Sequence, residues 1–196
     1  MEKKLEFGQL LSNTFTIGLK NLPSLVGCIV LWGLTIWIPY VNVGTTIAIV
    51  TIPAALSKGK VISPLEIFDK KYFRYMGEFF LVTGLRSIIL FPAAMFLIVP
   101  AIVLGIAYSL STLLVVDKGK GAADALKLSN KLTYGNKLTI FLAQLVLGIG
   151  IMVVLFILSK IWSVLVLIGL ILIAPIMLGF KANIYGQLAV DVQEEE

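Results

Sequence analysis

The sequence predicts an all-α integral membrane protein with six transmembrane helices in three hairpins, each preceded by an amphipathic helix at the cytoplasmic interface. Three long, mostly apolar stretches carry this prediction: residues 22–57, 79–116 and 138–182. Each stretch is too long for one crossing of a ~30 Å hydrocarbon core and suits two helices of ~20 residues. With 59% hydrophobic and 14% charged residues, the composition excludes an ordinary soluble domain, which is about one quarter charged.

Helix-breaking or polar residues divide each apolar stretch into two spans. Pro39 and Asn42 interrupt the first stretch and Pro100 the second, because proline lacks a backbone donor and clashes with the preceding helical turn. Ser159 and Lys160 interrupt the third. The expected spans are residues 22–39, 43–57, 79–98, 100–116, 138–158 and 162–182.

The distribution of basic residues predicts the orientation. Of the 16 Lys and Arg residues, Arg86 lies within a span and Lys160 lies beyond the far ends of the spans, which leaves 14 on one side. Cytoplasmic loops are enriched in Lys and Arg. We therefore expect both termini in the cytoplasm.

Amphipathic segments near residues 5–18, 64–76 and 121–134 are expected to lie in the cytoplasmic interface, because each pairs an apolar stripe with a basic face. In the second, Ser63 followed by Glu66 is typical of a capping box. Its apolar stripe recurs at helical spacing: Leu65, Phe68, Tyr72, Tyr75 and Phe79.

An internal repeat is predicted from residues 11–20 and 128–137, which share Leu, Ser, Asn, Thr, Gly and Lys at matched positions. Gly18, Gly77 and Gly135 are each expected to end an interfacial helix by adopting a positive φ angle. One domain, residues 1–190, would then contain units at about 5–57, 63–116 and 121–182. Residues 191–196 are expected to form a solvated acidic tail.

Residues 108–137 resemble a group of prokaryotic membrane proteins that includes the membrane domain of some glycerophosphodiester phosphodiesterases. The shared features are the apolar run that ends in Asp117, then Ala125-Leu126, Ser129 and Gly135-Asn136. The resemblance implies a six-span helical fold in a prokaryotic cell membrane. It does not imply phosphodiesterase activity, which belongs to a separate soluble domain rich in acidic and histidine residues.

The residue types argue against an enzyme and against a metal or other cofactor. Histidine is absent, Cys28 is the single cysteine, and no carboxylate falls within an expected span. A serine nucleophile would therefore lack a neighbouring base. The net charge of +5 lies beside the spans, so we expect anionic lipids rather than nucleic acid as partners.

Arg86 and Gln144 are the polar residues of most interest within the spans. Arg86, about 13 Å beyond Gly77 at 1.5 Å per residue, either snorkels to the head groups, as we favour, or forms a polar site inside the bundle. Gln144 either bonds between helices or contacts a ligand. Asp117 is expected to cap the following helix, with Arg86 or Lys118 as alternative partners. Further lipid-contact candidates lie on the interfacial helices: Lys70, Lys71, Arg74, Lys127 and Lys131.

Two functions follow from these features. The first is a non-enzymatic membrane protein that organises lipid or serves as a subunit of a membrane complex, with a protein partner or a second copy of itself. The alternative is a transporter, or an export or immunity component, for a small amphipathic or hydrophobic molecule. A coupling ion for such a carrier would have to bind backbone carbonyls, because the spans lack acidic residues.

Overall fold

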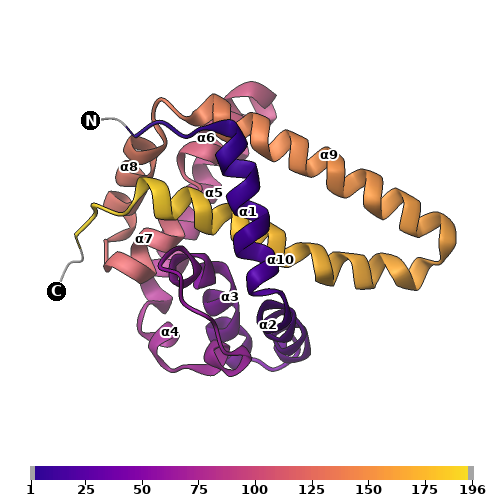
Figure 1. The fold of residues 1–196 in the computed structure, drawn as a ribbon. Helices are drawn as coiled ribbons and strands as arrows, with labels where there is room; N and C mark the ends of the chain where they lie inside the picture. The colour runs from indigo at the N-terminus through magenta and orange to yellow at the C-terminus, as the bar shows by residue number, and fades with distance from the viewer. Residues whose placement is uncertain (1–2, 194–196) are drawn as a thin grey trace.

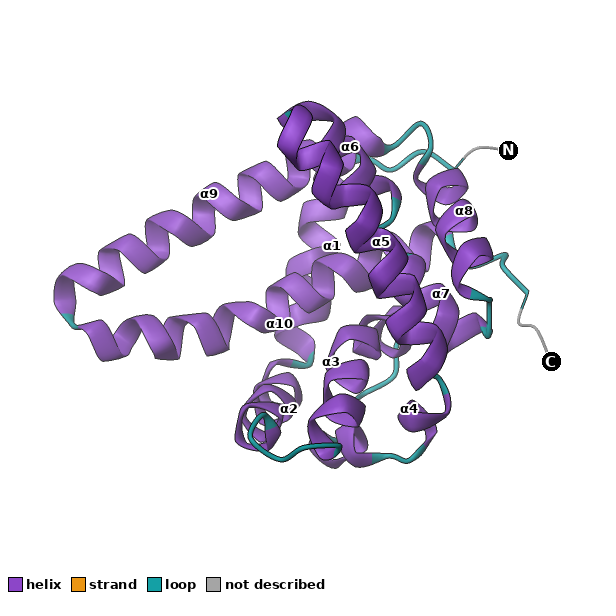
Figure 2. Cartoon of the chain, turned by 180° about the vertical axis from the view of Figure 1, so that it is seen from behind, coloured by secondary structure: helices purple, strands orange, loops and turns teal. Residues whose placement is uncertain are grey.

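The computed structural model describes residues 3–193, which contain helices and connecting loops without a strand (Figures 1 and 2). The prediction of an all-α protein is therefore confirmed for this part of the chain. Residues 194–196 of the expected acidic tail lie outside it. The helices are α1 (Phe7–Lys20), α2 (Leu22–Thr35), α3 (Val41–Ser57), η1 (Pro64–Phe68), α4 (Lys71–Arg74), α5 (Met76–Phe96), α6 (Ile98–Ala107), α7 (Ser111–Lys118), α8 (Ala122–Thr133), α9 (Lys137–Ile161) and α10 (Ser163–Leu188).

Within residues 3–193, four helical segments are long and apolar enough to cross a membrane: α5, α6 together with α7, α9 and α10. A fifth crossing exists only if α1 and α2 form one span despite the 71° bend between them. α3, with 17 residues, is shorter. A protein with several membrane-spanning helices is thus supported, whereas the expected six spans and three hairpins are not confirmed.

The α9–α10 hairpin projects from the rest of the molecule (Figures 1 and 2). Its far end exposes large apolar side chains, among them Met152 at 72% and Phe156 and Trp162 at 63% each. Apolar exposure of this extent around a helical hairpin is suited to lipid rather than water.

The first expected hairpin differs most from the prediction. Tyr40, in the turn between α2 and α3, stacks on Phe73 of α4 with 4.9 Å between ring centroids. A Cβ atom at Gly44 would overlap the same Phe73 ring, so glycine makes this approach of α4 to α3 feasible. Tyr40 and Phe73 were expected on opposite sides of a ~30 Å layer. Their contact places α4 along the side of α3.

The second interfacial helix is also not continuous. Residues 64–68 form the 3-10 helix η1, and Asp69 is extended at ψ 128° before the single turn of α4. Asp69 Oδ1 accepts a 2.9 Å hydrogen bond from the backbone N–H of Lys71, and such side-chain bonds compete with helix formation. Ser63 makes no capping hydrogen bond, while Glu66 forms a 2.8 Å ion pair with Lys71. The capping-box prediction is wrong.

Only one of the three glycine turns has the expected geometry. Gly135 has φ +76°, whereas Gly18 lies inside α1 and Gly77 inside the first turn of α5. The chain instead turns between α1 and α2 at Asn21. The matched positions also differ in burial, since Ser129 is buried and Ser12 is exposed. The internal repeat stays a prediction.

α1 lies across α10 in the middle of the molecule (Figure 1). A Cβ atom at Gly179 would lie 2.8 Å from the Thr14 carbonyl oxygen and 2.9 Å from the Gly18 nitrogen. The two backbones therefore touch directly. The carbonyl of Leu10 accepts hydrogen bonds from Asn183 Nδ2 at 2.9 Å and from Thr14 Oγ1 at 2.7 Å.

A cationic cavity between α5, α6, α9 and α10

One cavity of about 430 Å³ gathers charged and polar side chains from four parts of the bundle. Arg86 comes from α5, Ser109 from the turn between α6 and α7, Gln144 from α9 and Lys181 from α10. We call this the cationic cavity. Both polar residues that the sequence singled out within the spans, Arg86 and Gln144, thus meet at one place.

Each of the three long polar side chains lies about two to three helical turns from one end of its helix. Arg86 lies ten residues after the start of α5, Gln144 seven after the start of α9, and Lys181 seven before the end of α10. At 1.5 Å per residue, each lies about 10–15 Å from that end of its helix. Because Arg86 and Lys181 line the same cavity, both long cationic side chains can reach one polar group there.

Arg86 and Lys181 are partly buried, and neither forms a hydrogen bond or an ion pair with another residue in the range 3–193. Ser109 donates its hydroxyl hydrogen to the Ile106 carbonyl at 2.8 Å. Two like charges close to apolar surroundings repel each other and lose hydration. The electrostatics of the cavity accordingly favour an anion.

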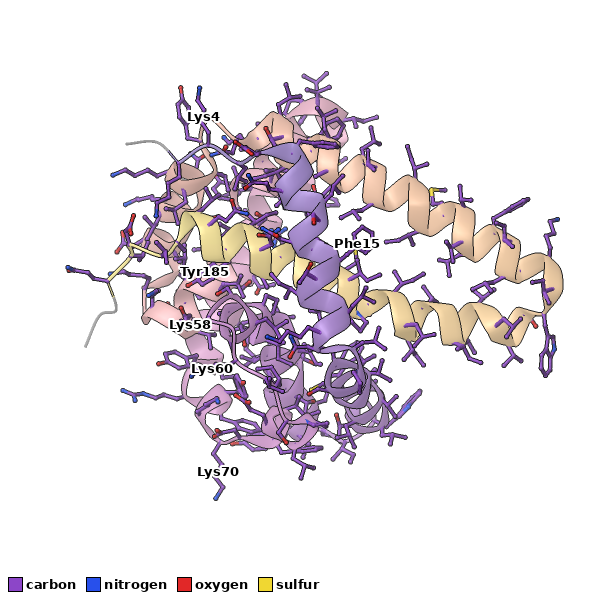
Figure 3. The ribbon with its side chains drawn as sticks, viewed as in Figure 1. Lys4, Phe15, Lys58, Lys60, Lys70 and Tyr185 are labelled. Carbon is purple, nitrogen blue, oxygen red and sulfur yellow. The ribbon has the colours of Figure 1, made fainter. Side chains whose placement is uncertain are left out.

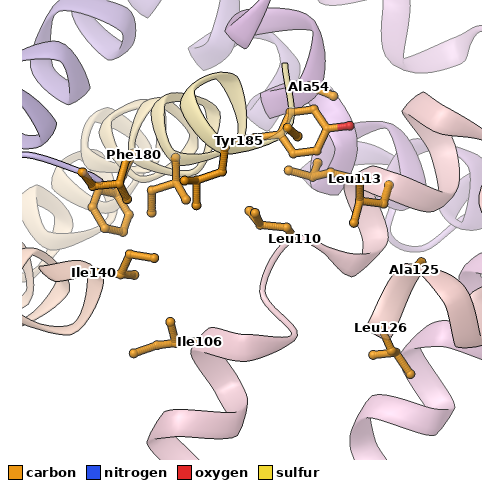
Figure 4. Packing of buried hydrophobic residues seen from close by; sticks show 14 of the residues in the cluster. Ala54, Ile106, Leu110, Leu113, Ala125, Leu126, Ile140, Phe180 and Tyr185 are labelled. Atoms are coloured by element: carbon orange, nitrogen blue, oxygen red, sulfur yellow. The ribbon is translucent and has the colours of Figure 1, made fainter. Parts of the chain in front are cut away.

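The inner wall of the cationic cavity is apolar. Ile106, Leu110, Ile140 and Phe180 line it and belong to the main buried cluster, in which residues of α6, α9 and α10 face one another (Figure 4). Leu110 and Ile140 are almost fully buried. This packed wall fixes the helices from which the polar side chains extend.

The basic candidates on the interfacial segments lie elsewhere. Lys71 pairs with Glu66 at 2.8 Å and with Asp69 at 3.3 Å, and the bond from its backbone N–H holds the pKa of Asp69 below its usual value. Lys70, Lys71 and Arg74 are all exposed. In Figure 3, Lys70 lies with Lys58 and Lys60 on the side of the molecule opposite the α9–α10 tip.

Lys127 and Lys131 of α8 line a different hollow of about 600 Å³, together with Lys3 and Asp191. Lys3 forms a 2.6 Å ion pair with Asp191. This pair brings the two ends of the described chain together. It also gives Asp191, expected in a solvated tail, a specific partner.

Asp117 does not cap the next helix and does not contact Arg86. Its Oδ1 forms a 2.6 Å ion pair with Lys58, and its Oδ2 accepts a 2.9 Å hydrogen bond from the hydroxyl of Tyr185. Glu78 of α5 accepts the hydrogen bond from the backbone N–H of Ala122 instead, at 2.9 Å. The capping expectation for Asp117 is wrong, because a carboxylate from another helix fills that position.

Lys181 is the residue of the cavity that sequence reasoning missed. It was counted among the basic residues at the end of a span expected to stop at residue 182, whereas α10 continues to Leu188. A signal was present: between Lys160 and Asp191, Lys181 is the one charged residue of the sequence. A charge within so long an apolar stretch marks a functional candidate in the same way as Arg86.

No known protein family, characterised protein or solved structure matches this chain. The resemblance of residues 108–137 to the prokaryotic membrane-protein group therefore stays a prediction. Within residues 3–193, no group of three or more Cys, Asp and Glu side chains is placed to hold a metal ion.

Proposed function

We propose that this is a non-enzymatic integral membrane protein that binds an anionic lipid at the cationic cavity. It thereby organises that lipid, or serves as a lipid-dependent subunit of a membrane complex. The observation that supports the proposal is that two cations, Arg86 and Lys181, line one cavity and have no counter-charge among residues 3–193. Unpaired charges at membrane depth are costly, and a bound phosphate would relieve that cost.

The cavity is suited to a lipid head group more than to a fully soluble anion. A guanidinium can donate two parallel hydrogen bonds to a phosphate, while an ammonium adds a point charge. Beside these cations, the exposed side chains of Ile102 and Met177 line the same cavity. A ligand with an anionic group joined to an apolar body matches both features.

The proposal includes an orientation with both termini in the cytoplasm of a prokaryotic cell. The charge asymmetry supports it, and the resemblance of residues 108–137 supports the cell membrane. This orientation holds if α2 and α3 both cross the membrane or if neither does, since a hairpin returns the chain to its starting side. With or without these two crossings, Lys160 lies on the opposite side from the remaining loop lysines.

The test compares lipids that stay bound to the protein in nanodiscs made of phosphatidylethanolamine and phosphatidylglycerol, measured by native mass spectrometry. Wild type should retain phosphatidylglycerol selectively. The double variant Arg86→Gln/Lys181→Gln should lose about tenfold or more, because each charged hydrogen bond contributes roughly 1.5–3 kcal/mol. The control Lys127→Gln/Lys131→Gln removes the same charge from the other hollow and should retain the lipid. Equal retention by both double variants would contradict the proposal.

A transporter for an amphipathic anion is the second candidate. It is favoured by one observation: Arg86 shares an interhelical cavity with Gln144 and Lys181. Protein in vesicles with fluorescent phosphatidylglycerol distinguishes the two functions, since dithionite quenches only the outer leaflet. Transfer between leaflets that requires Arg86 and Lys181 would favour transport over static binding.

A further inference from the structure

A second cavity, of about 400 Å³, lies between α6 and the start of α9. Its lining is apolar except for Lys137: Val99, Ile102, Val103, Ile106, Leu138 and Phe141. The Nζ atom of Lys137 donates a 2.8 Å hydrogen bond to Asn130 Oδ1, so its charged end already has a partner outside the cavity. We call this cavity the apolar groove. Its chemistry suits a hydrocarbon chain.

The apolar groove adjoins the cationic cavity, because Ile102 and Ile106 line both. Two cations therefore lie at one end of a hollow whose other end is apolar except for Lys137, whose ammonium is bonded to Asn130. A soluble anion would contact only the cationic cavity and would leave the apolar groove unoccupied. An anionic lipid would use both.

We infer that the apolar groove between α6 and α9 holds an acyl chain of the anionic lipid whose phosphate lies between Arg86 and Lys181. The inference rests on the proposed function and adds a defined place for the chain. The occupant is argued from charge complementarity at one end and from continuity through Ile102 and Ile106. At the exposed tip of α9–α10, Lys160 Nζ lies 5.1 Å from the centre of the Phe156 ring, so the tip offers that one cation beside apolar surface rather than the pair formed by Arg86 and Lys181.

Chain location, rather than chain affinity, is the appropriate measurement. Within a bilayer, moving a hydrocarbon tail from lipid to protein brings no hydrophobic gain. Long and short chains should consequently differ little in retention. Their position should still be fixed by the head group and by the shape of the groove.

The experiment uses phosphatidylglycerol with a photoactivatable diazirine in its acyl chain, incorporated with the full-length protein in nanodiscs. Adducts are mapped by peptide mass spectrometry. We expect adducts in residues 98–107 and 137–144 at about fivefold or more over residues 150–165, a ratio that corresponds to a modest preference. A phosphatidylethanolamine probe with the same chain serves as the comparison and should label the apolar surfaces evenly.

Val103→Trp fills the groove without altering a residue of the cationic cavity, and Val153→Trp is the matched control on the exposed part of α9. Val103→Trp should reduce groove adducts about fivefold while retained phosphatidylglycerol changes less than about twofold. Val153→Trp should change neither. The inference would be overturned if the Val103→Trp substitution left the amount of groove adducts unchanged. It would also be overturned if the phosphatidylglycerol probe labelled the same residues as the phosphatidylethanolamine probe.

The two proposals fail in different ways. If Arg86→Gln/Lys181→Gln leaves lipid retention unchanged, the proposed function fails. If that variant loses the lipid but wild-type adducts avoid the groove, only the chain position is wrong.

Discussion

The side-chain amide of Asn183 in α10 donates a 2.9 Å hydrogen bond to the backbone carbonyl of Leu10 in α1. These residues are 173 positions apart, and both are buried. A buried amide without a partner costs about 1–3 kcal/mol, so this bond helps to fix how the first helix docks on the last.

Asn183→Ala should lower stability by about 1–3 kcal/mol, because it removes the donor to Leu10 and the acceptor for Gln187. Thermal unfolding in detergent measures the change. Asn130→Ala removes an exposed amide and should shift the midpoint much less. Equal shifts would show that the buried bond adds nothing.

Gly179→Ala should destabilise by about 1–3 kcal/mol, because the new methyl group would overlap the backbone of α1. Gly148→Ala in α9 is the matched control, since no atom lies within 4 Å of the added Cβ. That control should be neutral or stabilise by up to about 1 kcal/mol. A loss in the control as large as that of Gly179→Ala would refute the close crossing.

Ser129→Ala should lower stability by about 1–3 kcal/mol. Ser129 Oγ donates to the Ala107 carbonyl at 2.6 Å and accepts from the Leu110 N–H at 3.1 Å, where the chain breaks between α6 and α7. Ser12→Ala changes the matched position of the predicted repeat, which is exposed, and should stay within about 0.5 kcal/mol. Chemical or thermal unfolding of both variants provides the comparison.

Cysteine labelling tests the position of the first hairpin. On a Cys28→Ala background, Asn42→Cys and Lys70→Cys should react from the same side of the membrane, because Tyr40 stacks on Phe73. Lys160→Cys should react from the other side. Opposite labelling of Asn42 and Lys70 would restore the six-span arrangement.

Ionisation of Tyr72 should lower the free energy of unfolding at high pH. Burial raises the pKa of Tyr72 to about 12, against the opposing charge of Lys71. Because the folded protein holds this proton more tightly than the unfolded chain, the contribution is complete below about pH 10 and disappears towards pH 12. Tyr72→Phe should flatten the pH dependence in this window; a profile identical to wild type would argue against the raised pKa.

The length of the apolar runs predicted the helical class and placed the long apolar segments well, since it depends on the chain's own composition. The expected span 43–57 corresponds to α3, which begins at Val41 and ends at Ser57. The expected span 138–158 lies within α9. Bilayer-length apolar runs leave few alternatives to helix.

What the sequence could not supply came from contacts between distant segments. The Asp69 side chain bonds locally and ends η1, which overrides an apolar stripe of good helical spacing. Gly18 provides close contact with α10 rather than a turn, a role that depends on a partner more than 150 residues away. The cationic cavity was half predicted: Arg86 and Gln144 were singled out, and Lys181 was missed because α10 runs beyond the expected end of the span.

The docking of α1 on α10 has a consequence for biosynthesis. A ribosome delivers residues 7–20 long before residues 163–188, so the nascent first helix has no completed binding surface until translation is nearly finished. In the interval, its buried stripe of Leu10, Thr14 and Gly18 must be shielded by lipid or by an insertion factor. Truncation within the last helix should therefore release the amino-terminal segment as well, and expose both ends of the protein to proteolysis together.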